Sequence, residues 1–240
     1  MVSGPSGLLT CLRNFLASRT VLVSMRPFLL CAIVWLAAAT LVPPALAAGP
    51  PVILIVGDSL SAGYGLVPGQ GWVALLQQRL KREGYGYRVV NASVSGETTD
   101  GGLTRLSRAL ARDAPAIVVI ALGGNDGLRG LPVPRVRANL EGMIDRSRAA
   151  GAEVVLVGIR VPTNYGPRYT GAFQEIYADL AHRYRIGLVP FILQDIALRT
   201  ELFQADGIHP NAAAQPLLLE RVWPELEATL RRRSALPGQR

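Results

Sequence analysis

Five short segments, four of them apolar runs and one with a Val-Val pair at its centre, recur along the chain and give way to glycine or polar residues. They are 52–56, 88–92, 117–122, 154–159 and 188–192. Runs of this length with such ends are typical of buried parallel strands. Apolar residues that recur every three or four positions, the spacing of one helix face, fill the intervals between the runs. The pattern therefore predicts strands that alternate with helices.

The helices are expected around 72–83, 103–110, 136–144, 173–184 and 212–232. Pro224 is expected to kink the last of them. Strands and helices that alternate at this pitch form right-handed units on a parallel sheet with both faces covered. The prediction is an α/β fold, namely a three-layer α/β/α sandwich with a central, mostly parallel five-stranded sheet.

The first 47 residues are unlike the rest, because they contain three arginines and no acidic residue. Arg26 precedes the apolar run 28–42, and Ala45-Leu46-Ala47 has the small-x-small form of a cleavage site. The run is too short for a membrane span and is followed by two prolines. We expect residues 1–47 to be an N-terminal extension and secretory signal peptide that is removed, and 48–240 to be a single domain. The start of translation is left open between Met1 and Met25.

Composition excludes several classes of protein. Cys11 and Cys31 both lie in the segment expected to be removed, so no disulfide is predicted in the mature chain. His182 and His209 are far apart without ligand spacing, so no metal is expected, and no phosphate-binding glycine loop indicates a cofactor. The net charge of +8 comes mostly from dispersed arginines, with one dense basic patch at 231–233. Nucleic acid is therefore not a predicted partner, whereas transient contact with lipid surfaces stays open.

Polar, glycine-rich segments follow the predicted strands, at the edge of an open α/β sheet where ligands bind. They are Gly57-Asp58-Ser59-Leu60-Ser61-Ala62-Gly63-Tyr64, Asn91-Ala92-Ser93-Val94-Ser95-Gly96-Glu97-Thr98, Gly123-Gly124-Asn125-Asp126 and Asp206-Gly207-Ile208-His209-Pro210-Asn211. We expect the first of them to be a loop too rich in glycine for a helix interior. Taken alone, each of these residues is also compatible with a purely structural role. Ser59, Asn125 or Asp206 would cap a helix or turn, Gly96 would supply a positive φ, and Asp58 is expected to be a structural hydrogen-bonding partner.

A serine hydroxyl becomes a good nucleophile only when a base takes its proton. His209 follows Asp206 by three residues, so the carboxylate can reach one ring nitrogen and leave the other to face Ser59. His182 is expected to be an exposed residue near a helix end. Four such segments on one sheet edge favour catalysis over four independent structural uses.

These four segments resemble the marker blocks of the SGNH (GDSL) hydrolase superfamily, whose fold is flavodoxin-like. Within it, the chain is most similar to the bacterial exported multifunctional thioesterase, protease and lysophospholipase subfamily, often labelled arylesterase, over about 51–227. The resemblance implies Ser59 as nucleophile, His209 as general base and acid, and Asp206 as its orienter. It also implies oxyanion donors from the backbone amides of Ser59 and Gly96 and the side-chain amide of Asn125.

Substrate contacts are expected from the segment 126–131 and from the segment 160–169. Two glycines bracket an apolar residue in the first of these, which suits a movable flap over an apolar groove. The resemblance implies a loop that closes over acyl chains. The expected substrate-binding residues are Asp126, Gly127, Leu128, Leu131 and Tyr165.

The sequence thus predicts a serine hydrolase that cleaves carboxylic esters and thioesters of acyl chains through an acyl-enzyme. One alternative is a carbohydrate O-deacetylase on the same fold, and another is a non-catalytic lipid or acyl carrier. The partner is expected to be a small-molecule acyl ester or thioester, the protein a monomer, and its location the periplasm or the outside of the cell.

Overall fold

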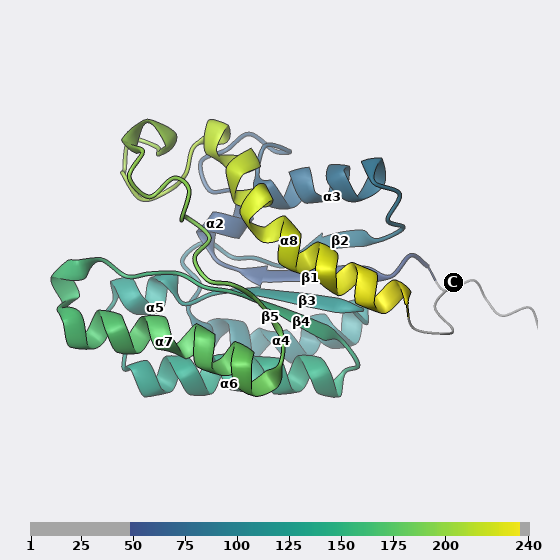
Figure 1. Ribbon diagram of the computed structural model, residues 1–240, viewed down its shortest axis with the longest axis horizontal. Helices are drawn as coiled ribbons and strands as arrows, with labels where there is room; N and C mark the ends of the chain where they lie inside the picture. Colours follow the sequence, from purple (N-terminus) through teal and green to yellow (C-terminus); the bar gives the residue numbers. More distant parts are fainter. Residues whose placement is uncertain (1–48, 236–240) are drawn as a thin grey trace, which may run out of the picture. The chain divides into compact units, whose positions relative to one another are not determined.

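The computed structural model describes residues 49–235, and the predicted leader peptide with its cleavage site lies outside these residues. The described part is an α/β/α sandwich. Figure 1 shows α3 (Trp72–Arg82) and α8 (Gln215–Ser234) over one face of the sheet, and α4 (Thr99–Asp113), α6 (Val133–Ala149) and α7 (Pro167–Tyr184) over the other. The predicted fold class is confirmed.

The sheet is parallel throughout, with the strand order β2-β1-β3-β4-β5. Its strands are β1 (Val52–Gly57), β2 (Arg88–Asn91), β3 (Ile117–Ala121), β4 (Glu153–Val157) and β5 (Gly187–Val189). The chain leaves β1 toward β2 on one side and builds β3, β4 and β5 on the other. Loops that leave β1 and β3 therefore separate at a switch point, where open α/β sheets form ligand sites.

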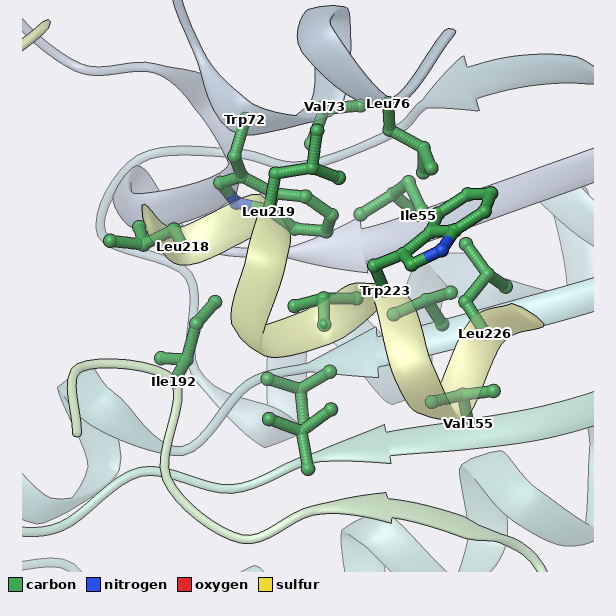
Figure 2. Packing of buried hydrophobic residues seen from close by; sticks show 14 of the residues in the cluster. Ile55, Trp72, Val73, Leu76, Val155, Ile192, Leu218, Leu219, Trp223 and Leu226 are labelled. Atoms are coloured by element: carbon green, nitrogen blue, oxygen red, sulfur yellow. The ribbon is translucent and has the colours of Figure 1, made fainter. Parts of the chain in front are cut away.

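Two apolar layers explain why the strands read as continuous apolar runs. Ile53, Ile55 and Val119 pack under α3 and α8, whereas Leu54 and Val118 pack against α4, α6 and α7. Because alternate strand residues point to opposite faces, both sets must be apolar. Figure 2 shows the first layer, in which side chains from α3 and α8 interdigitate above the strands.

Local sequence also sets several helix boundaries. Thr98 caps α4 by accepting a hydrogen bond from the Gly101 amide at 3.5 Å. The helices α6, α7 and α8 each carry proline in the first turn, where a missing N–H costs no intrahelical bond. None of the helices within residues 49–235 has the length and apolarity needed to cross a membrane.

The structure corrects some of the expected boundaries. The fifth strand is Gly187–Val189 rather than 188–192, because Pro190 has no N–H for the ladder. The last helix starts as a 3₁₀ turn, η3 (Ala212–Ala214), and α8 then continues through Pro224. The expected kink at that proline stays a prediction.

Two short helices lie where no helix was predicted, and the first replaces the expected loop. The residues after β1 form α2 (Ser59–Ala62), and those after β3 form α5 (Gly124–Leu128). Single helical turns are shorter than any apolar periodicity can reveal. Figure 1 shows both at the same end of the sheet. The remaining 3₁₀ turns are η1 (Thr163–Tyr165) and η2 (Thr200–Leu202).

Candidate active site

Ser59 is the first residue of α2, directly beyond the carboxyl end of β1. Asp58 is the N-cap, and its Oδ1 accepts a hydrogen bond from the Leu60 amide at 3.0 Å. Gly63 ends the turn in the left-handed region with φ 78°, a conformation that glycine adopts without strain. The capping role considered for Ser59 as an alternative thus belongs to its neighbour, and the serine hydroxyl is left for another partner.

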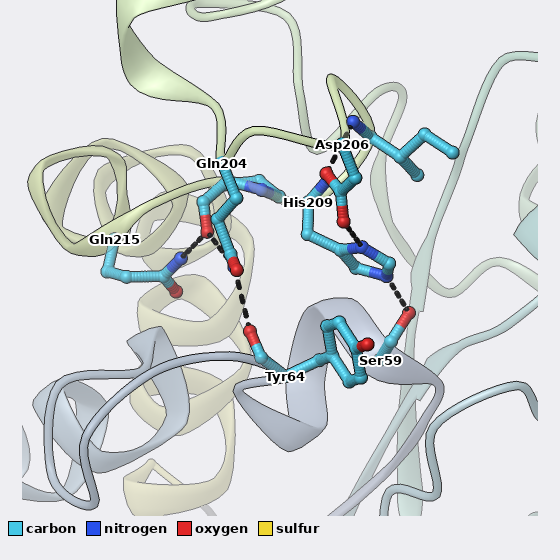
Figure 3. Close-up of polar contacts among 8 residues, drawn as sticks. Ser59, Tyr64, Gln204, Asp206, His209 and Gln215 are labelled. Atoms are coloured by element: carbon cyan, nitrogen blue, oxygen red, sulfur yellow. Dashed lines mark hydrogen bonds and ion pairs between the residues drawn. The ribbon is translucent and has the colours of Figure 1, made fainter.

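That partner is His209 from the loop before α8. The Ser59 Oγ and His209 Nε2 atoms are 2.9 Å apart, and His209 Nδ1 and Asp206 Oδ2 are 2.7 Å apart (Figure 3). With the proton on Nδ1, the ring donates to the carboxylate and its other nitrogen accepts the serine proton. The structure brings together the three residues that the sequence placed at one sheet edge.

Asp206 shapes the loop as well as facing the ring. Its Oδ1 accepts hydrogen bonds from the amides of Ile208 and His209 at 2.9 and 3.0 Å. The His209 amide, the His209 ring and the Ile208 amide lower the pKa of Asp206 to about 2. This carboxylate is therefore ionised at neutral pH. Asp206 therefore both caps the turn and faces the His209 ring.

Neighbouring side chains hold the histidine loop against α2. The rings of Tyr64 and His209 pack with their centroids 4.5 Å apart. The Gln204 side chain donates to the carbonyl groups of Tyr64 and Pro210, at 2.8 and 3.2 Å. Gln215 donates to the Pro210 carbonyl at 3.3 Å (Figure 3). It also accepts a hydrogen bond from the Trp72 amide at 3.0 Å. These contacts fix the relative position of segments about 140 residues apart in the sequence.

Sequence reasoning missed Tyr64, Gln204 and Gln215 as supports of the site. No local signal identifies the two glutamines, because their partners lie far away in the chain. Gly65 gives one indirect signal of the contact with Gln204. Its φ is 72°, and a Cβ at this position would collide with the Gln204 side chain. Because the Gln204 amide is the flexible end of a side chain, the positive φ of Gly65 is the stronger reason for glycine at that position.

Asn125 lies in the first turn of α5, after Gly123, whose φ is 118°. Its Nδ2 donates to the Glu97 carbonyl at 3.0 Å and lies 3.5 Å from Asp58 Oδ2. The side-chain amide therefore stands between the loop after β2 and the segment that carries Ser59. Asn125 is not the helix cap, a position that Gly123 occupies.

Two backbone amides complete a set of donors. Among residues 49–235, the N–H groups of Ser59 and Gly96 donate to no protein acceptor. Gly96 has a φ of 80°, and its carbonyl accepts from Arg129 Nη2 at 3.1 Å. The Val94 amide donates to the Gly57 carbonyl at 3.0 Å, which holds this loop beside the end of β1. Free N–H groups near a nucleophile are the elements of an oxyanion hole.

Asp58 is buried directly behind the serine. Burial raises its pKa to about 6, partly opposed by the hydrogen bond from the Leu60 amide and by the charge of His209. Asp58 is thus the structural hydrogen-bonding partner that the sequence predicted, and it is an ionisable group close to the reacting centre.

The expected substrate-binding residues separate into two groups. Asp126 is 1% exposed, and its two carboxylate oxygens accept from the Thr99 amide at 2.9 Å and the Thr99 hydroxyl at 2.6 Å. These bonds fix α4 to α5, and the expected contact of Asp126 with substrate stays a prediction. Gly127 is also buried, and a Cβ there would collide with Val161, so it serves close packing.

The other three residues lie on accessible segments. Leu128 is exposed, and its carbonyl accepts from the Tyr165 hydroxyl at 2.6 Å. The Leu131 carbonyl accepts from the Tyr169 hydroxyl at 2.8 Å. These bonds anchor the predicted flap to η1 and α7, so its opening stays a prediction. Tyr165 and Tyr169 line an open pocket of about 610 Å³ beside the segment, with Pro132 and Arg168.

His182 is exposed in the last turn of α7, as predicted, and is not part of the site. Within residues 49–235, no group of three or more histidine, cysteine or carboxylate side chains has the arrangement of a metal site.

Comparison with known proteins gives consistent findings. Residues 55–216 match the model of the GDSL-like lipase/acylhydrolase family. The chain is 56% identical to the esterase TesA of Pseudomonas aeruginosa over 178 residues, which cover 74% of this chain and 89% of that protein. It is 41% identical to the thioesterase 1/protease 1/lysophospholipase L1 of Escherichia coli over 181 residues, which cover 75% and 86%.

A solved structure adds the three-dimensional comparison. The psychrotrophic esterase EstA from a Pseudoalteromonas species, inhibited by monoethylphosphonate, is 42% identical to this chain and superposes with a TM-score of 0.72. The match covers 75% of this chain and 98% of that structure.

Proposed function

The chain belongs to the GDSL-like lipase/acylhydrolase family and is an ester hydrolase, and from this premise we propose that Ser59, His209 and Asp206 carry out the reaction. The single observation that supports these roles best is the continuous contact from the serine Oγ through the imidazole to the carboxylate, at 2.9 and 2.7 Å.

In the proposed first step, His209 Nε2 takes the proton of the Ser59 hydroxyl as Oγ attacks the carbonyl carbon of the acyl group. The carbonyl oxygen becomes an oxyanion, which the amides of Ser59 and Gly96 and the Asn125 side chain would stabilise. When the tetrahedral intermediate collapses, the bond to the leaving group breaks and Nε2 returns the proton to the departing alcohol or thiol. The acyl group is then an ester of Ser59.

In the second step, water loses a proton to Nε2 and attacks the acyl-enzyme through the same oxyanion. The Ser59 oxygen leaves, takes the proton back from Nε2, and the carboxylic acid departs. Asp206 stays ionised throughout, since its pKa is about 2, and stabilises the imidazolium that forms in each step.

We propose esters and thioesters of acyl chains as the substrates, in line with the esterase, thioesterase and lysophospholipase names of the relatives. The accessible apolar side chains of Leu128 and Tyr165 near the site support an apolar acyl group. Preferential hydrolysis of acetylated sugars would instead favour the deacetylase alternative.

The mechanism is tested by substitution and by covalent labelling. Ser59→Ala and His209→Ala are each expected to reduce hydrolysis of a p-nitrophenyl ester by several orders of magnitude. Asp206→Asn is expected to reduce it somewhat less, because the geometry survives while the tautomer does not. A reactive alkyl phosphonate ester is expected to attach one phosphonyl group covalently to the wild type, seen by intact mass, and none to Ser59→Ala. His182→Ala serves as the control, and equal activity of Ser59→Ala and His182→Ala would reject the mechanism.

We also propose that the protein is exported to the periplasm and loses residues 1–47. Support comes from the sequence alone, namely Arg26, the apolar run 28–42 and the small residues Ala45 and Ala47. Sequencing of the mature N-terminus from an export-competent host is expected to give a start at or near Ala48. A chain that retains residues upstream of Pro43 would contradict this proposal.

A further inference from the structure

Exposed large apolar side chains gather at one edge of the described structure. Within residues 49–235, seven such side chains are between 36% and 97% exposed. They are Tyr64, Val67, Val94, Leu128, Tyr165, Leu198 and Ile208, and together they are called the apolar rim. Single exposed apolar residues are common on proteins, so their distribution over the elements decides what they mean.

Every residue of the apolar rim lies in a segment that follows the carboxyl end of a strand. The segments after β1, β2, β3, β4 and β5 each contribute at least one. The short connections that enter the strands from the opposite edge contribute none, nor do the outward faces of α3, α4, α6, α7 and α8. Because all strands are parallel, the seven side chains share the edge of the sheet that carries Ser59.

Contacts place part of the rim directly at the reacting groups. The Tyr64 ring packs on the His209 ring, and Ile208 precedes that histidine in its loop. Leu128 and Tyr165 are joined by the hydrogen bond between the tyrosine hydroxyl and the leucine carbonyl. Val67 and Leu198 lie farther along their loops and are 65% and 97% exposed. These two side chains have no packing role that explains an apolar residue.

Charges at this edge complement a phospholipid surface. Most carboxylates here are matched by a cation. The pairs are Glu97 with Arg105, Asp100 with Arg135, Glu201 with Arg199 and Asp206 with His209. In the described chain, Arg129, Arg160 and Arg168 form no ion pair, and they lie in the same segments as Leu128 and Tyr165. Arg129 also donates to the Gly96 carbonyl and Arg160 stacks on the Phe191 ring, but neither contact neutralises the charge. Apolar side chains with interspersed unneutralised guanidinium groups suit acyl chains and phosphate groups, respectively.

We infer that the apolar rim docks on the surface of a phospholipid layer, so that an acyl ester passes from the lipid directly to Ser59. This inference rests on the proposed function, which it deepens by naming how the substrate is presented. Exposed apolar residues concentrated on one surface mark an interaction site, and a layer of acyl lipids contains the substrate class itself.

The opposite edge offers a competing surface. The long helices end there, and their last turns carry basic residues, among them Arg82, Arg112, Arg148, Arg183 and Arg232. These charges complement the helix dipoles, but they would also attract anionic lipid. Docking through that edge would need anionic lipid and would be lost at high salt. Docking through the rim should persist on neutral lipid.

The experiment measures binding with the inactive Ser59→Ala protein and phosphatidylcholine vesicles, with and without a minor fraction of phosphatidylglycerol, at low and high salt. Sedimentation with vesicles is expected in every condition. Adding Val67→Ser and Leu198→Ser is expected to weaken binding at least about tenfold, because two apolar side chains no longer enter the lipid. The matched control adds Arg82→Gln and Arg88→Gln at the opposite edge and is expected to bind as tightly as Ser59→Ala.

The outcomes distinguish this inference from the proposed function. In the active protein, Val67→Ser and Leu198→Ser should leave turnover of a soluble p-nitrophenyl acetate unchanged, which separates docking from chemistry. Absence of vesicle binding, or binding lost only in the arginine variant, overturns the inference while soluble-ester hydrolysis still supports the function. A concentration-dependent dimer in sedimentation velocity that disappears with Val67→Ser and Leu198→Ser would instead assign the rim to a second copy of the chain.

Discussion

At the scale of single residues, Asn125 is held ready by its surroundings. Its Nδ2 donates one hydrogen to the Glu97 carbonyl at 3.0 Å and lies 3.5 Å from Asp58, which fixes the amide plane. A donor that is oriented before the reaction needs no reorganisation as charge develops on the substrate oxygen. Its contribution should therefore appear in the transition state.

Asn125→Ala is expected to lower kcat roughly 100-fold or more with little change in KM, because the oxyanion forms only after binding. Steady-state kinetics on a soluble ester measure both constants. The control is Gln174→Ala in α7, an exposed amide side chain outside the site. A change confined to KM would make Asn125 a ground-state binding residue.

Asp58 predicts a dependence of stability on pH. Its pKa is about 6 in the folded state against an ordinary value of 3.8, so the folded state holds the proton more tightly. The contribution of Asp58 to the free energy of unfolding is complete below pH 3.8 and is lost as the pH rises through 6.

Asp58→Asn keeps a side-chain oxygen for the cap and removes the buried charge. The variant is expected to gain up to roughly 3 kcal/mol in the free energy of unfolding relative to wild type between pH 4 and pH 8. Urea unfolding at both pH values measures this difference, and Asp195→Asn controls for an exposed carboxylate. An identical Asp58→Asn effect at both pH values would show that the burial of charge is not what matters.

At the scale of elements, the site is built from one-turn helices that are held by hydrogen bonds to other elements. The one-turn helices α2 and α5 carry Ser59 and Asn125, and neither would be stable alone. Hydrogen bonds to distant elements hold them, such as those from Thr99 to Asp126 and from Tyr165 to Leu128. The end of α5 and the residues after it should therefore affect substrate choice separately from catalysis.

Leu128→Ser is expected to reduce the preference for longer acyl chains. Each buried methylene contributes about 0.8 kcal/mol, so a covered groove would favour a medium-chain ester over acetate by about two orders of magnitude in kcat/KM. p-Nitrophenyl esters of increasing length, kept below micelle formation, measure the preference. Turnover of acetate should stay within a few-fold of wild type, and Leu198→Ser, which lies outside the segment, should leave the whole series unchanged. Equal losses on acetate and octanoate would show that the segment supports the catalytic groups.

At the scale of the whole molecule, stability and catalysis lie in different places. The two apolar layers enclose the sheet, whereas the reacting groups lie on segments beyond the carboxyl ends of its strands. Leu76, seen in Figure 2, is fully buried in the layer between α3, α8 and the sheet. Truncation in this layer should affect folding without changing the chemistry.

Leu76→Ala is expected to lower the free energy of unfolding by about 2 to 5 kcal/mol, through lost transfer free energy and a residual cavity. Denaturant unfolding measures the loss, and soluble-ester turnover per folded molecule is expected to be unchanged. Leu75→Ala, at a partly buried neighbouring position, should cost less. A fall in turnover per folded molecule would show that the layer also positions Ser59.

Much of this protein was determined by local sequence. The apolar runs of the strands and the helix periodicity predicted the sandwich, because burial on two sheet faces imposes a continuous apolar pattern. Parallel strands then placed Ser59, Gly96, Asn125 and His209 at one edge, since all carboxyl ends point the same way. The marker blocks themselves were also readable from the sequence.

Beyond the contacts among Ser59, His209 and Asp206 that the sequence led us to expect, the tertiary structure decided which polar groups meet. The sequence predicted that Asp126 contacts substrate, whereas the fold buries its carboxylate against Thr99. The sequence also gave no indication that Gln204 and Gln215 support the site. Local pattern encodes which face of an element is apolar, but a hydrogen bond between distant segments depends on packing of the whole core. For the same reason, the seven residues of the apolar rim were unrelated in the sequence and became one surface only when five loops met at the edge of the sheet.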